Sequence, residues 1–166
     1  MKRKIRPIAI LAAICVLAVI GMIFSLIFGG RTPEPAGFTP PPWEAAAVQG
    51  TPDVPGDLGY SSPLADGMSY RFSVCGKVRV IGTEAIVYLT NPEGNNVWIK
   101  LRILDDAGNI LGETGLIKPG EYVKAVRLTA PPATGTRIRL KIMGYLPDTY
   151  QSAGAATLGT TVVSVE

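Results

Sequence analysis

Residues 97–104 read Val-Trp-Ile-Lys-Leu-Arg-Ile-Leu, and residues 136–143 read Thr-Arg-Ile-Arg-Leu-Lys-Ile-Met. In both stretches apolar residues alternate with polar or charged ones, which is the period of a strand with one buried face. We therefore expect the aliphatic side chains of each stretch to point into a core. Trp98 and the basic side chains of both stretches are expected to share the opposite, outward face.

The same alternation recurs along the C-terminal part of the chain, and no segment there has the 3.6-residue period of a helix. Turn-forming residues separate the expected strands, including Asn91-Pro92 and Pro119-Gly120. About seven short strands at this spacing are typical of an all-β domain, and we predict an immunoglobulin-like β-sandwich over residues 67–166. The expected strands cover residues 68–74, 77–81, 84–90, 97–104, 122–129, 136–143 and 160–165.

A membrane segment is expected at the start of the chain. Residues 1–6 include four basic residues, and no charged residue occurs from Pro7 to Phe28. As a helix, residues 8–28 would extend for about 32 Å, enough to cross a hydrocarbon core of ~30 Å. The basic tip predicts a cytoplasmic N-terminus, so residues 1–30 are expected to anchor the chain in the cell membrane by a single pass, with the C-terminal domain extracytoplasmic. A cleaved signal peptide is the alternative, although its apolar core is normally shorter.

A proline-rich segment, residues 31–66, separates the predicted anchor from the predicted domain. It holds 8 of the 14 prolines and has a net charge of −4. Few of its residues are branched or aromatic, so it is expected to bury too little surface to fold and to act as a disordered stalk. An extended chain of this composition would hold the domain up to about 100 Å from the membrane.

The composition excludes several kinds of catalytic chemistry. The chain has no histidine and only two cysteines, Cys15 and Cys75. Histidine bases, Ser-His and Cys-His pairs and His-ligated metals are therefore absent, and two cysteines are too few for a cysteine-rich zinc site. Cys75 has no histidine to activate it, so we expect it to pack as a small apolar residue or to lie half-exposed at a strand end before Gly76.

Asp105, Asp106 and Asn109 could suggest a calcium loop. An EF-hand needs a Glu near its twelfth position, however, where this chain has Leu116. The same residue types form tight turns, so we interpret residues 105–109 as a hairpin turn. Because a phosphate-binding glycine loop is also absent, the sequence predicts no metal, no cofactor and no catalytic residue, and hence a protein that is not an enzyme.

The outward residues of the two quoted stretches are the candidates for contact with a partner. Exposed Trp beside Arg is enriched in binding hot spots, and neighbouring basic strands would attract an anionic envelope polymer, lipid headgroups or another protein. The alternatives are a solvated face whose charges protect an edge strand, or a bulge that turns Trp98 into the core. Nucleic acid is not expected, since no recognisable binding motif is present. The candidates are Trp98, Lys100, Arg102, Arg137 and Arg139.

A set of turns and glycines in residues 85–130 carries a resemblance to a known group of proteins. Asn91-Pro92 is followed by Asp105 and Gly108, and then by Gly-Leu-Ile-Lys-Pro-Gly at residues 115–120. With the N-terminal anchor, this order resembles small membrane-anchored surface proteins of Gram-positive bacteria that are associated with mobile elements. Their shared core reads Asn-Pro, Asp-x-x-Gly and Gly-Leu-Ile-x-Pro-Gly. The resemblance implies a surface β-domain and no particular reaction.

Anchor, spacer and compact β-domain together predict a non-enzymatic binding or assembly module, an accessory to cell-envelope or mobile-element machinery. A structural surface subunit that self-associates is the first alternative, and an exposed edge such as residues 136–143 would give it a route for strand addition. A small cell-wall hydrolase or carbohydrate-binding protein is the second alternative, although no acid–base pair is evident.

Overall fold

The computed structural model describes residues 15–19, 38–61 and 69–165 of the chain. The chain divides into two compact units, Met1–Thr39 and Pro40–Glu166. In the first unit, residues 15–19 form a helical turn. The remainder of the predicted membrane segment, residues 8–28, lies outside the described residues. Among those that are described, no helix is long and apolar enough to cross a membrane.

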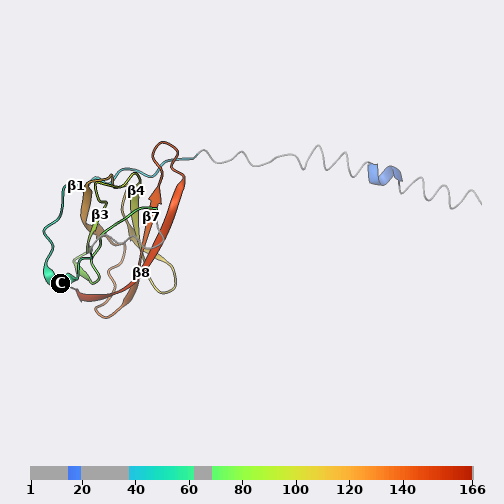
Figure 1. Cartoon of the computed structure of the whole chain (residues 1–166). Coiled ribbons are helices and arrows are strands. Elements are labelled where there is room, and N and C mark those ends of the chain that lie inside the picture. Colours follow the sequence, from blue (N-terminus) through green and yellow to red (C-terminus); the bar gives the residue numbers. More distant parts are fainter. Residues whose placement is uncertain (1–14, 20–37, 62–68, 166) are drawn as a thin grey trace, which may run out of the picture. The chain divides into compact units, whose positions relative to one another are not determined.

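The second unit is built from strands, which confirms the prediction of an all-β domain (Figure 1). Eight strands and one short 3₁₀ helix, η1 (Gly56–Leu58), are present in the described part. The strands are β1 (Val48–Gln49), β2 (Val78–Ile81), β3 (Glu84–Thr90), β4 (Trp98–Leu104), β5 (Ile110–Glu113), β6 (Glu121–Arg127), β7 (Arg137–Tyr145) and β8 (Ser152–Val165).

The strands are hydrogen-bonded in the order β1-β6-β3-β2-β8-β7-β4-β5. The long strand β8 links two groups of strands. Its residues 152–161 pair antiparallel with β7, and its residues 162–165 pair parallel with β2. The β7 side and the β2 side of this order form two layers, visible in Figure 1, that bury side chains in one shared core.

Alternation along the strands determines which side chains enter this core, as predicted. Ile99, Leu101 and Ile103 of β4 are 0% exposed, and every second residue of β7 from Ile138 to Ile142 is buried. The facing layer contributes apolar side chains from β2, β3 and β6. Close packing also requires a glycine, because a Cβ at Gly144 would lie 2.3 Å from the ring of Tyr70.

Residues 40–61 pack on the domain, whereas the sequence indicated a free stalk over 31–66. The Leu116 N–H donates to the Pro42 carbonyl (2.8 Å), and β1 pairs with β6. Leu58, 1% exposed, packs in a second apolar cluster with Cys75 and two β3 residues. Some apolar residues of this proline-rich segment, Leu58 among them, pack on the domain, which composition alone does not reveal. The compact unit therefore begins at Pro40 rather than at residue 67; residues 31–37 and 62–66 lie outside the described ranges.

The edge of the sheet also differs from the sequence-based expectation. β7, which covers most of residues 136–143, pairs with β4 on one side and β8 on the other, so it offers no edge for strand addition. Among the described strands, residues 152–161 of β8 pair only with β7. On the other side of this segment, the described residues contribute side-chain hydrogen bonds, including one from Tyr70 Oη to the Gly154 carbonyl.

Candidate functional site

The five predicted contact residues lie on the outer face of β4 and β7 but form separate groups. Trp98, Lys100 and Arg102 follow one another along β4, as the alternation predicts. On β7, Arg139 lies opposite Leu104, beyond the last of the three, and Arg137 lies further toward the strand's start. Since β7 extends for about 26 Å at ~3.3 Å per residue, Trp98 and Arg137 lie at opposite ends of the domain.

Lys100 and Arg102 are held in an ion-pair network with Glu113 of β5. The Lys100 ammonium donates to Glu113 Oε1 (2.9 Å), and Arg102 donates to Glu113 Oε2 through Nε (3.0 Å). Lys100 is only 7% exposed. Partial burial by itself raises the pKa of the Glu113 carboxyl, but the hydrogen bonds from Lys100 and Arg102 hold that pKa below its usual value. These two basic residues therefore stabilise the sheet and present little free charge.

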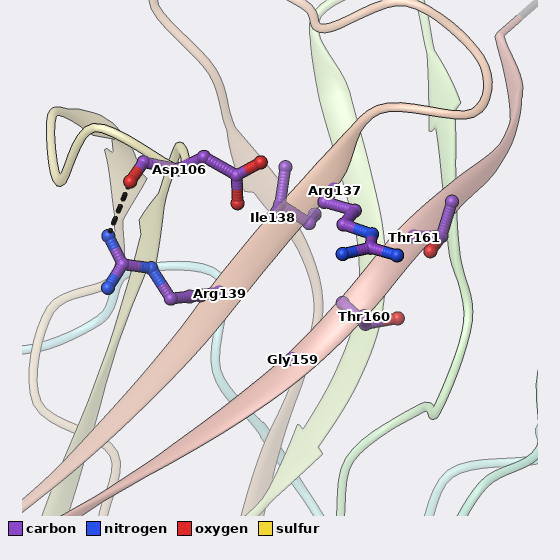
Figure 2. A pocket seen from close by; sticks show the side chains of 7 residues that line it. All are labelled: Asp106, Arg137, Ile138, Arg139, Gly159, Thr160 and Thr161. Carbon is purple, nitrogen blue, oxygen red and sulfur yellow. Dashed lines mark hydrogen bonds between the residues drawn. The ribbon is translucent and has the colours of Figure 1, made fainter.

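Arg137 stands at a shallow hollow on the far end of the outer face. The hollow has a volume of about 310 Å³ and is shown in Figure 2. The Arg137 guanidinium extends toward Thr160 and Thr161 of β8, and the carboxylate of Asp106 extends toward Ile138. Arg137 is exposed, and no hydrogen bond joins its guanidinium to another described residue. It is thus the predicted basic residue that is most available to a ligand.

Gly159 keeps the β8 side of the hollow open. It lies opposite Arg139 in the β7–β8 pairing. A Cβ at Gly159 would meet no atom within 4 Å, so the space above this residue is empty of protein. A side chain placed here would occupy the hollow without disturbing the strand.

Arg139 borders the same hollow, but it also holds the β4–β5 turn in place. One terminal nitrogen of its guanidinium donates to the carbonyls of Asp105 (3.0 Å) and Asp106 (3.3 Å). Its Nε is buried and has no hydrogen-bond partner among the described residues. Arg139 is therefore a positioning residue for the turn that carries Asp106.

The turn at residues 105–109 has the hairpin geometry that we expected. The Asp105 carboxylate accepts hydrogen bonds from the Asn109 side chain and backbone N–H, each 2.7 Å long, and these bonds lower its pKa. Both carboxylate oxygens of Asp105 are thus engaged within the turn. In the described part of the chain, no group of three His, Cys, Asp or Glu residues is placed to hold a metal ion.

Trp98 belongs to an aromatic cluster at the other end of the domain. Its ring meets Trp43 edge-on at 4.7 Å between centroids and Tyr150 at 5.1 Å. The Lys118 ammonium lies 4.7 Å from the centre of the Trp43 ring, within range of a cation–π interaction. Trp43 is 45% exposed. Strand alternation predicted an outward Trp98, but it gave no signal for Trp43 and Tyr150, which come from the predicted stalk and from the β7–β8 loop.

Cys75 is fully buried among apolar side chains. Burial, with a smaller effect from the charge of Asp57, raises the pKa of its thiol to about 11. A thiol with this pKa is protonated at neutral pH and is a poor nucleophile. The expectation that Cys75 packs as a small apolar residue is met.

No protein-family model matches the sequence, and no curated protein matches it. The predicted relation to surface proteins of Gram-positive bacteria therefore stays a prediction. Among solved structures, two crystal structures of Ruminococcus gnavus β-glucuronidase, one in complex with uronic isofagomine, match 55% of this chain at 18% identity with a TM-score of 0.37. The matched part covers 15% and 14% of those chains. A similarity of this extent does not bear on the function of this protein.

Proposed function

We propose that this protein is a non-enzymatic binding module, anchored in the cell membrane by residues 8–28, that presents its β-domain outside the cytoplasm. The domain is an immunoglobulin-like sandwich, and its role is that of an accessory to cell-envelope or mobile-element machinery. The proposal is supported by the uncharged apolar segment that follows a basic N-terminal tip in the sequence, and by an accessible cationic hollow on the β-domain.

The observation that carries the proposal is the position of Arg137 beside the open surface above Gly159. A guanidinium that has no hydrogen-bond partner among the described residues, next to hydroxyl groups and an uncovered backbone, suits an oxyanion, because arginine donates two parallel hydrogen bonds to phosphate or carboxylate. Lys141, two residues beyond Arg139 on the same face of β7, adds positive charge. The favoured ligand class is thus an anionic group of an envelope polymer or of a partner protein.

The binding test uses the full chain in lipid nanodiscs and fluorescent polyglycerol phosphate as an anionic probe. Arg137→Glu should weaken binding about tenfold or more, the effect of losing a charge-assisted contact of about 1.5–3 kcal/mol. Arg127→Glu is the matched control, because Arg127 is an exposed arginine on β6 in the other layer. An equal loss of probe affinity in both variants would show that binding depends only on net charge, and it would contradict a role for the hollow.

A second variant tests the hollow without changing any charge. Gly159→Val should fill the open space above β8 and weaken probe binding, while valine favours the extended backbone of a strand. The thermal unfolding temperature should therefore stay the same or rise. Unchanged probe binding in a stably folded Gly159→Val protein would contradict a role for this hollow.

The proposed topology is tested on intact cells with a lysine reagent that does not cross membranes. The domain offers exposed Lys77, Lys118 and Lys124 for modification. Labelling of these residues is expected if the domain is extracytoplasmic. Labelling that requires permeabilised cells would place the domain inside and would overturn the localisation, whatever the result with the anionic probe.

Self-association is the second candidate function, favoured by one feature of β8. The edge segment over residues 152–161 contains neither a charged residue nor a proline, two of the features that normally prevent strands from pairing at an edge. Thr157→Lys would place a charge at the middle of this edge. If the protein forms oligomers through β8, sedimentation velocity should show that this variant is monomeric.

A further inference from the structure

The aromatic cluster lies at the end of the domain where the chain enters from the N-terminal unit. Pro42 is hydrogen-bonded to Leu116, and the next residue, Trp43, packs on Trp98. The loop between β7 and β8, which contributes Tyr150, reaches the same place. In Figure 1 this loop and the start of the domain lie at one end of the sheets, and the C-terminal end of β8 lies at the other.

Aromatic side chains gather at this end of the domain. Two tryptophans and Tyr150 are in contact, Leu146 is 38% exposed on the adjoining loop, and Lys118 lies against the Trp43 ring. Tryptophan and tyrosine concentrate where a bilayer meets water, because their rings are apolar and their N–H and O–H groups are polar. A lysine at this level can keep its ammonium among the headgroups.

The backbone holds Tyr150 in this cluster at some cost. Its φ is 56°, in the left-handed region that bulky side chains rarely adopt, and Asp148 two residues earlier has a φ of 65°. In this conformation the Tyr150 ring packs against the Trp98 ring.

The length of the connecting chain limits how far this end can lie from a bilayer. Pro40 follows Phe28, the end of the predicted membrane segment, by 12 residues. Even a fully extended chain of that length spans only about 40 Å. The stalk proper is therefore much shorter than the sequence suggested, since residues 40–61 belong to the domain.

We propose that this aromatic end, made of Trp43, Trp98, Tyr150, Leu146 and Lys118, docks on the lipid surface of the membrane that holds the anchor. The inference rests on the proposed membrane anchorage. Docking is at the level of the headgroups, because Asp148 at the loop tip is exposed and opposes deeper insertion. The nearby carboxylate of Glu44 is already hydrogen-bonded to two backbone N–H groups. The domain would then direct the Arg137 hollow away from the bilayer.

Intrinsic fluorescence can test the docking directly, because Trp43 and Trp98 are the two tryptophans of the chain. The full chain is placed in phosphatidylcholine nanodiscs whose acyl chains carry bromine, a quencher that acts over short distances. We expect a loss of tryptophan emission relative to unbrominated discs. Bromine near the headgroups should quench more than bromine near the chain ends.

Two variants with the same chemical change show whether the aromatic end makes the contact. Leu146→Glu adds a charge to the proposed docking surface and should abolish the quenching. Ile110→Glu is the control, since Ile110 is 49% exposed and pairs with Leu104 at the opposite end of β4. Circular dichroism checks that both variants are folded. Equal quenching in both folded variants would overturn the inference.

The same samples separate failure of the docking from failure of the anchor. Chain that does not co-elute with nanodiscs would overturn the membrane anchorage itself. Chain that co-elutes but shows no quenching by bromine at any depth would overturn the docking and leave the anchorage standing. Co-elution with shallow quenching supports both.

Discussion

The Glu44 carboxylate accepts a 2.7 Å hydrogen bond from the backbone N–H of Gly115, a residue 71 positions further along the chain. The backbone N–H of Glu44 also donates a hydrogen bond to the Leu116 carbonyl. These bonds fasten the proline-rich segment to the turn region after β5. They make residues 40–61 an integral part of the domain, and they place Trp43 against Trp98.

Gly115→Ala should release this segment. A Cβ at Gly115 would lie 2.5 Å from the Glu44 nitrogen and 2.6 Å from the Trp43 carbonyl carbon, and such overpacking costs about 1–3 kcal/mol. We expect a lower free energy of unfolding and faster proteolysis within residues 40–61. Gly94→Ala is the control, since a Cβ at Gly94 would meet no atom within 4 Å. Equal stability of the two variants would show that the segment is not held at Gly115.

Leu58→Ala should destabilise the whole domain, although Leu58 lies in the segment that the sequence predicted to be a disordered stalk. Leu58 is 1% exposed, and removing a buried leucine side chain costs about 2–4 kcal/mol. Chemical denaturation of the variant should show this loss. Ile81→Ala provides the comparison, because Ile81 is 46% exposed and its truncation should change stability by only about 0.5 kcal/mol. A Leu58→Ala protein as stable as the parent would mean that the segment is dispensable.

Glu113→Gln should destabilise the domain, because the nearly buried charge of Lys100 then has no counter-charge. We expect the free energy of unfolding to fall by about 1–3 kcal/mol. Adding Lys100→Met should recover part of this loss, because the unpaired charge is then gone. A double-mutant cycle of unfolding free energies measures the coupling. If the cycle closes additively, the ion pair does not contribute to stability.

The same carboxylate predicts how stability depends on acid. The pKa of Glu113 is lower in the folded protein than the ~4.3 of an unfolded glutamate, so its contribution is complete above that value. The contribution is lost as the pH falls through the folded pKa. Unfolding measured across the acid range should therefore show a shallower pH dependence in Glu113→Gln than in the parent. An identical slope would contradict the assignment.

The Cys75 thiol should resist alkylation until the domain unfolds. Because its pKa is raised to about 11, folding favours the neutral thiol, and this contribution is complete below the unfolded value of ~8.5. Stability should then decline as the pH rises toward 11, and less steeply in Cys75→Ala. In a Cys15→Ser background, iodoacetamide should label the chain in denaturant but hardly under native conditions. Rapid native labelling would show that the second apolar cluster opens readily.

Strand alternation predicted most of the sheet but not its irregular parts. The expected limits of residues 84–90 coincide with β3, and β4 and β7 agree to within two residues at each end. The first five residues of β8, Ser-Ala-Gly-Ala-Ala, have low strand propensity and no alternation, yet pairing with β7 makes them part of a strand. Leu58 and Trp43 could not be placed in advance, because their partners lie far away in the chain.

The sequence predicted which face of the strands carries the candidate residues, but it did not predict the ion pairs that these residues form. Alternation correctly placed Lys100 and Arg102 on the outer face of β4, but it does not identify the residues of the neighbouring strand that lie beside them. A register shift between Ile103 and Leu104 brings Glu113 across from Arg102, whereas regular counting outward from the turn would have placed Gly112 there. The separation of Trp98 from Arg137 depends on how β4 and β7 are aligned, which no local pattern determines.

The strand β8 pairs with both layers, and it is the last strand of the domain to be synthesised. β2 pairs with β8 across an interval of 84 residues, from Val78 to Val162, so this contact has a high contact order and is slow to form. A ribosome or a secretion channel that delivers the chain from its N-terminus releases β1 to β7 before the strand that closes them. The domain can therefore complete its fold only after residues up to Val165 have emerged, and until then the edge of β7 that β8 later covers stays open to other chains.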